Sequence, residues 1–239
     1  MAQVRAEPSV RAYVLALASA ALGFLVITLA TAHGWLLPVD EPMLRWIAAH
    51  RDCGDVALAT GLSFAGAGEV SLLLTALLAA VCLVRRRSRA AAALLLLYLS
   101  VPIELGLKLT LAQPLPGVLF PIPGACEWYH PTISVLTPHS YPSGYAIRVT
   151  YFFVLAAAWL LHRQAANSAH VPQARLRARL IMLLLAGVLA LLLASRLVLS
   201  WHWPTDLLGG ALLGGALATA TLLASHHAAP VQPVVAGRR

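Results

Sequence analysis

Long apolar segments separated by short polar connections dominate the pattern of this chain. A helix needs about 20 apolar residues to cross the roughly 30 Å hydrocarbon core of a bilayer. Six segments reach that length, namely 12–32, 60–84, 90–112, 143–162, 178–199 and 204–225. The pattern predicts an all-α fold, a polytopic membrane protein with a bundle of six transmembrane helices, in which residues 1–239 form a single domain.

Two connections differ from ordinary turns. Residues 38–52 are too polar to span a membrane and are typical of a short helix that lies in the interface. The connection 113–141 contains six prolines, which favour an irregular loop. We expect this loop to lie outside the cytoplasm, over any site at that end of the bundle.

The basic residues are distributed unevenly between the two ends of the predicted bundle. Twelve of the 17 fall at one end: Arg5, Arg11, Arg85, Arg86, Arg87, Arg89, Arg163, Arg175, Arg177, Arg179, Arg238 and Arg239. Loops rich in Lys and Arg remain in the cytosol. The distribution predicts cytosolic N and C termini in a multi-pass protein of the inner (cytoplasmic) membrane.

Composition agrees with this class of protein. Hydrophobic residues make up 60% of the chain and charged residues 11%, against roughly 25% charged in an ordinary soluble domain. Mean hydropathy is +0.79. These values exclude a disordered chain and a disulfide-stapled secreted scaffold. The net charge of +8 does not indicate a nucleic-acid partner, because no basic face alternates with stacking aromatics. The bilayer is the expected partner, and the sequence does not indicate an oligomeric state.

Two cysteines, Cys53 and Cys126, fall on the predicted outer side. They form a disulfide if their Cα atoms lie within about 7 Å of each other, and otherwise remain free thiols. Both alternatives stay open from the sequence.

The most informative polar cluster lies between the last two spans, where Ser195, Arg196, His202 and Asp206 occur within "SRLVLSWHWPTD". Asp206 follows His202 by four residues, so its carboxylate can accept the imidazole Nδ1–H and leave Nε2 to attack an electrophile. Arg196 supplies a planar fork for anionic oxygens. The alternative is a solvated turn with ordinary interfacial side chains. No third ligand is suitably spaced, so no metal is predicted.

A second cluster, "YPSGYAIR", opens the fourth span. Ser143 and Gly144 offer unpaired backbone N–H groups at a helix N-terminus, a favourable place for a phosphate. Arg148 follows on the same helix face, and a membrane-embedded arginine requires an anion. The alternative is a plain Pro-Ser-Gly helix start.

A third cluster contains Glu104 and Lys108, the only lysine of the chain. Four residues apart on a helix, they either neutralise each other as an ion pair or leave Lys108 to bind phosphate.

Together the three clusters resemble the motifs of the type 2 phosphatidic acid phosphatase and vanadium haloperoxidase superfamily, in its integral-membrane lipid phosphatase branch. The resemblance covers about residues 36–225. Ser195, Arg196, His202 and Asp206 match the third motif, S-R-x5-H-x3-D, completely. It implies that His202 attacks phosphorus and forms a phosphohistidine that water hydrolyses, while Asp206 orients it.

The first two motifs diverge from the family pattern. The second usually reads P-S-G-H, and Tyr145 replaces its histidine, the acid for the leaving group. The first usually reads K-x6-R-P, and here Lys108 is followed by "QPLP", with Leu115 in place of an arginine. We expect Arg148 to supply the missing charge, and Tyr145 or His139 to supply the missing acid.

The resemblance implies a metal-independent membrane lipid phosphatase that needs no cofactor. We expect it to hydrolyse a lipid phosphate or diphosphate on the extracytoplasmic face, either a phospholipid phosphate or a prenyl diphosphate such as undecaprenyl diphosphate. A diphosphate needs a general acid less, since its leaving phosphate already stabilises charge. Two alternatives remain: an impaired member that binds or moves a phospholipid, and a lipid phosphotransferase.

Overall fold

The computed structural model describes residues 10–122, 126, 137–168 and 172–226, and within these ranges the chain is helical, without strands. The helices are α1 Val10–Ala32, α2 Leu37–His50, α3 Cys53–Ser63, α4 Gly68–Val84, α5 Ser88–Leu94, α6 Ser100–Thr110, α7 Pro116–Leu119, α8 Gly144–Ser168, α9 Pro172–Val198 and α10 Pro204–His226. Short 3₁₀ segments, η1 Phe64–Gly66 and η2 Leu95–Leu99, join α3 to α4 and α5 to α6.

Six of the helical segments are long and apolar enough to cross a membrane, which confirms the predicted number of spans. The second differs from its expected range of 60–84, because it begins at Cys53. The Asp52 carboxylate accepts a hydrogen bond from the Asp55 N–H at 2.9 Å, and the Asp55 carboxylate accepts one from the Asp52 N–H at 3.1 Å. This capping box starts a helix within a stretch that hydropathy alone assigns to a connection.

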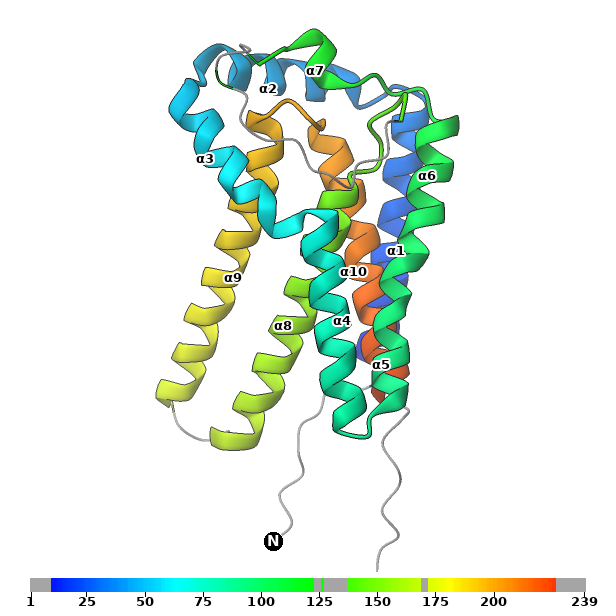
Figure 1. The fold of residues 1–239 in the computed structure, drawn as a ribbon, viewed down its shortest axis with the longest axis vertical. Coiled ribbons are helices and arrows are strands. Elements are labelled where there is room, and N and C mark those ends of the chain that lie inside the picture. The colour runs from blue at the N-terminus through cyan, green and yellow to red at the C-terminus, as the bar shows by residue number, and fades with distance from the viewer. Residues whose placement is uncertain (1–9, 123–125, 127–136, 169–171, 227–239) are drawn as a thin grey trace, which may run out of the picture.

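Helix α10 lies at the centre of the bundle, against α1 and α8 (Figure 1). In the most apolar 18-residue stretch of α10, 56% of the residues are buried, whereas in that of α1 only 6% are. Two glycines bring the backbones of α8 and α10 together, since a Cβ on Gly210 or Gly214 would overlap the carbonyl of Ser143 or Ile147. This close packing holds the "YPSGYAIR" cluster at the start of α8 in a fixed position relative to Asp206 at the start of α10.

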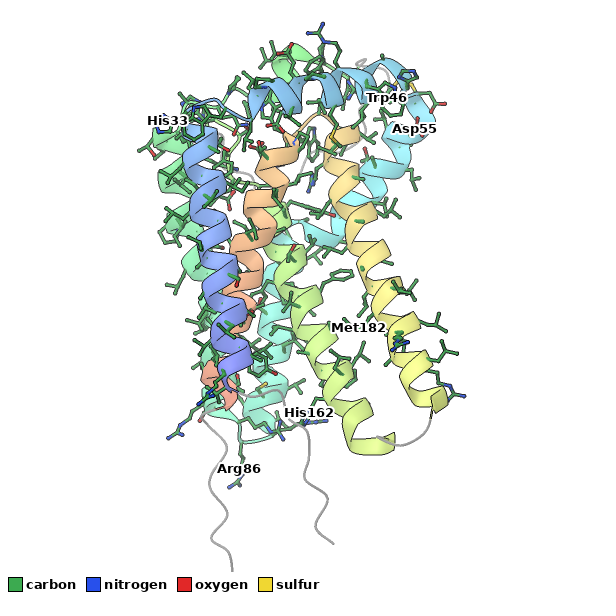
Figure 2. All side chains as sticks on the ribbon, turned by 180° about the vertical axis from the view of Figure 1, so that it is seen from behind. His33, Trp46, Asp55, Arg86, His162 and Met182 are labelled. Atoms are coloured by element: carbon green, nitrogen blue, oxygen red, sulfur yellow. A yellow bond between two sulfur atoms is a disulfide. The ribbon has the colours of Figure 1, made fainter. Side chains whose placement is uncertain are left out.

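The two ends of the bundle differ. Helices α2 and α7 lie across one end, and α3 descends obliquely from it (Figure 1). Trp46 and Asp55 lie at that end, whereas Arg86 and His162 lie at the other (Figure 2).

Cys53 and Cys126 form a disulfide with a Cα–Cα distance of 5.2 Å, which settles the question left open by the sequence. It attaches the start of α3 to the connection 113–141. Within that connection, residues 123–125 and 127–136 lie outside the described part of the chain. Its described part is irregular apart from the four-residue α7, as its prolines predict.

Candidate active site

A cavity of about 410 Å³ collects most of the candidate residues at the end of the bundle that α2 and α7 cover. Residues that line it include Tyr98, Glu104, Lys108, Gly144, Tyr145, Arg148, Arg196 and His202. Residues from all three sequence clusters therefore line one cavity, although Glu104 and His202 are 98 positions apart along the chain.

His202 and Asp206 adopt the expected pairing. His202 Nδ1 lies 3.2 Å from Asp206 Oδ2, which also accepts the Trp203 N–H at 2.9 Å. Asp206 is fully buried in the first turn of α10. Because Nδ1 faces the carboxylate, Nε2 is the ring nitrogen left for the cavity. Burial lowers the pKa of His202 well below its ordinary value, and the charges of Lys108 and Arg196 lower it further. The neutral imidazole is the nucleophilic form of a histidine side chain.

The start of α10 is fixed from outside the three clusters. Asp40 on α2, fully buried, accepts hydrogen bonds from the Thr205 N–H at 3.2 Å and from the Thr205 hydroxyl. Gln113 Nε2 donates to the same hydroxyl at 3.3 Å. Sequence reasoning missed Asp40, because its partner lies 165 positions away and no local pattern connects the two.

Arg51 holds the turn that precedes His202. Its guanidinium donates to the Val198 carbonyl at 2.6 Å and to the Ser200 hydroxyl at 2.5 Å. It also donates to the carbonyls of Phe120 and Pro121, both at 3.0 Å. Ser200 has a left-handed backbone with φ of 50°, which a serine adopts only at a cost that such contacts offset. Sequence reasoning placed Arg51 only in a polar interfacial segment.

Arg196 lies between two aromatic rings at the end of α9. Its Cζ is 3.7 Å from the ring centre of Tyr145 and 4.7 Å from that of Trp201, and 4% of the residue is exposed. The Tyr145 hydroxyl donates to the Leu62 carbonyl at 3.1 Å. Tyr145 thus supports a cation with its ring while its proton is directed at the backbone.

Arg148 and Lys108 bring two further cations to the cavity. Arg148 Nε donates to the Gly66 carbonyl at 3.0 Å. Lys108 Nζ lies 2.9 Å from Glu104 Oε1, so the ion pair that the spacing allows is formed. Both members of this pair line the cavity, so pairing does not remove Lys108 from the site.

Some expected site residues lie elsewhere. Ser143 is buried, its N–H donates to the Asp206 carbonyl at 3.1 Å, and its hydroxyl accepts the Ala146 N–H at 3.3 Å. The expectation of an unpaired Ser143 N–H is therefore wrong, because α8 and α10 approach closely enough to use it. His139 and Leu115 are not among the described residues that line the cavity.

One lining residue carries chemistry that sequence reasoning missed. The Tyr98 hydroxyl is buried and has no hydrogen-bond partner among the described residues. Its place in an apolar span, within "LLLLYLS", is the signal that could have identified it. Among the same residues, no three His, Cys, Asp or Glu side chains gather as a metal site would require.

Comparison with known proteins gives two matches. The model of the PAP2 superfamily matches residues 69–229. The structure is similar to the crystal structure of a transmembrane PAP2 type phosphatidylglycerolphosphate phosphatase from Bacillus subtilis, with a TM-score of 0.64 and 21% identity. That similarity covers 86% of this chain and 94% of the other. Among curated protein sequences, none matches. Because the family model spans more than half of the sequence, the chain belongs to the PAP2 superfamily.

Proposed function

We propose that this protein hydrolyses a lipid phosphate or diphosphate in the cavity, with His202 as nucleophile. The observation that carries the proposal is the His202–Asp206 pair, whose second ring nitrogen faces a space shared with Lys108, Arg148 and Arg196. A neutral nucleophile beside three cations matches the needs of attack on an anionic phosphoryl group.

In the proposed reaction, Nε2 of His202 attacks phosphorus and the bond from phosphorus to the leaving oxygen breaks. The cations stabilise the phosphoryl oxygens, and Asp206 stabilises the imidazolium that forms. Water then attacks phosphorus, the bond to nitrogen breaks, and inorganic phosphate leaves with one water oxygen. The alcohol or lipid monophosphate takes its proton from solvent or from an acid in the cavity.

The lining supports a lipid as substrate. Leu72, Val101 and Leu105 line the apolar part of the cavity and are also 52%, 53% and 38% exposed on the bundle surface. Such side chains face acyl chains when the bundle lies in a bilayer. We propose that the lipid chain enters between α4 and α6 while its phosphate reaches His202.

The arginine distribution supports a site on the extracytoplasmic face. Arg86 lies at the end opposite the one that carries Trp46 (Figure 2). The end of α9 and the start of α10, which bring Arg196 and His202 to the cavity, lie toward the end that α2 covers (Figure 1). Under the positive-inside rule, the cavity then opens outside the cytosol of the inner membrane.

We propose a preference for diphosphates over monoesters. The usual second-motif histidine is replaced by Tyr145, whose proton is directed at the Leu62 carbonyl, and His139 is not among the lining residues. Loss of a general acid costs about 10²–10⁴ in rate when the leaving group is a poor one. A lipid monophosphate leaves more readily than an alkoxide, so a diphosphate tolerates this site better.

The test is phosphate release from phosphatidate, phosphatidylglycerol phosphate and a prenyl diphosphate in mixed micelles. Wild type, His202→Ala and Tyr145→His are compared. We expect release by wild type, fastest from the diphosphate, and none by His202→Ala. Activity in Tyr145→His alone would instead show an impaired member that binds lipid. Transfer of phosphate to an added lipid alcohol rather than to water would show a phosphotransferase.

A further inference from the structure

The carboxylate of Glu104 lies directly against the first residue of α8. A Cβ on residue 144 would overlap both carboxylate oxygens, so the glycine leaves the room that this carboxylate fills. The N-terminus of a helix carries a partial positive charge, and α8 runs for 25 residues from this point. Glu104 thus brings a negative charge to the place where the second motif would receive a phosphate.

Glu104 lines the same cavity as Lys108, Arg148 and His202. Its Oε1 lies 2.9 Å from Lys108 Nζ. The side chains of Glu104 and Lys108 are only 19% and 13% exposed. With little water to screen them, a second anion beside Glu104 would be strongly repelled.

We infer that Glu104 is a resident anion in the phosphate subsite, which a phosphoryl group must displace from Gly144 and Lys108 before it reaches His202. This inference rests on the proposed function and adds a specificity-determining residue to it. In the exchange, the contact of Lys108 with the carboxylate is replaced by a contact with phosphate oxygens.

The exchange favours substrates that carry more charge. A monoester offers one phosphoryl group to replace the contacts of Glu104 and to reach His202. A diphosphate offers a second group, so one phosphate holds Lys108 while the other lies at His202. Glu104 therefore strengthens the preference for diphosphates.

The experiment measures binding of inorganic phosphate to the full chain in detergent micelles, by calorimetry and by the phosphate-induced rise in Tm. Variants Glu104→Gln and Glu104→Ala remove the charge. We expect either variant to bind inorganic phosphate at least about tenfold more tightly than wild type, with a larger rise in Tm. Glu41→Gln is the matched control, because Glu41 pairs with Arg45 at the same four-residue spacing, outside the cavity. It should bind as wild type does.

Equal or weaker phosphate binding by a folded Glu104 variant, including no binding, would overturn the inference. The two proposals fail separately. If no lipid phosphate is hydrolysed yet Glu104→Gln tightens phosphate binding, the function is wrong and the resident anion stands. If hydrolysis depends on His202 and Glu104→Gln does not tighten binding, the function stands and the resident anion is wrong.

Discussion

Asp40 on α2 accepts hydrogen bonds from both the N–H and the hydroxyl of Thr205, the residue that precedes Asp206. A helix lying across the end of the bundle thereby caps the helix that carries Asp206, the partner of His202. Asp40 is not among the described residues that line the cavity, so we regard it as a positioning residue.

Replacing Asp40 tests this role. Asp40→Ala leaves the Thr205 N–H buried without its acceptor, which costs about 1–3 kcal/mol of unfolding free energy. We expect kcat to fall about tenfold while KM changes little, because the cations of the cavity are untouched. Asp40→Asn retains an acceptor and should restore most of kcat. A loss of activity through KM alone, or no rescue by Asn, would contradict a positioning role.

The protonation of Asp40 predicts a pH dependence of stability. Burial raises the pKa of Asp40 to about 6 from an ordinary 3.8, so the folded protein binds this proton more tightly than the unfolded chain does. Its contribution is present below pH 3.8 and is lost as pH rises through about 6, by up to about 3 kcal/mol. Unfolding of wild type and Asp40→Asn, measured from pH 4 to 8, should show this slope as a difference between the two proteins. Parallel curves would refute it.

Much of this fold follows from the sequence, and the reason is physical. The thickness of the bilayer sets the length of each apolar span, so hydropathy predicts the six helices, and the placement of the arginines predicts their orientation. The His202–Asp206 pair can also be predicted from the sequence, because its members are only four residues apart. Contacts between distant elements cannot be predicted in this way, because Asp40 and Thr205 meet only once α2 lies across the start of α10. The hydrogen-bond partner of the Ser143 N–H likewise depends on how closely α8 and α10 approach each other, which no local sequence pattern predicts.

Arg51 should be required for an ordered turn before His202. Its four acceptors belong to two segments, so Arg51→Ala leaves two partly buried carbonyls, one exposed carbonyl and the Ser200 hydroxyl without this donor. We expect a loss of about 1–3 kcal/mol in stability and a drop in kcat of at least tenfold. Arg45→Ala, which removes an exposed arginine of α2, the helix that ends just before Arg51, serves as the control and should change neither. Equal effects of the two variants would show that the turn does not depend on Arg51.

Two variants of Tyr145 distinguish the role of its ring from the role of its hydroxyl proton. Tyr145→Phe keeps the ring under Arg196 and removes only the hydroxyl that donates to the Leu62 carbonyl. We predict that kcat of Tyr145→Phe stays within about fivefold of wild type, whereas Tyr145→Leu raises KM for the phosphate substrate through loss of the cation–π contact. A loss of 10²–10⁴ in kcat for Tyr145→Phe would instead identify the hydroxyl as the general acid.

If His202 is the nucleophile, it becomes phosphorylated during turnover. This is measured by rapid quenching of the full-length protein during turnover of a prenyl diphosphate labelled in its terminal phosphate, followed by mass spectrometry of the peptide that contains His202. We expect an acid-labile phosphoryl group on His202 that forms and decays at the rate of phosphate release and is absent from His202→Ala. Phosphate release by His202→Ala at the wild-type rate, with no phosphoryl group on the wild-type peptide, would contradict it.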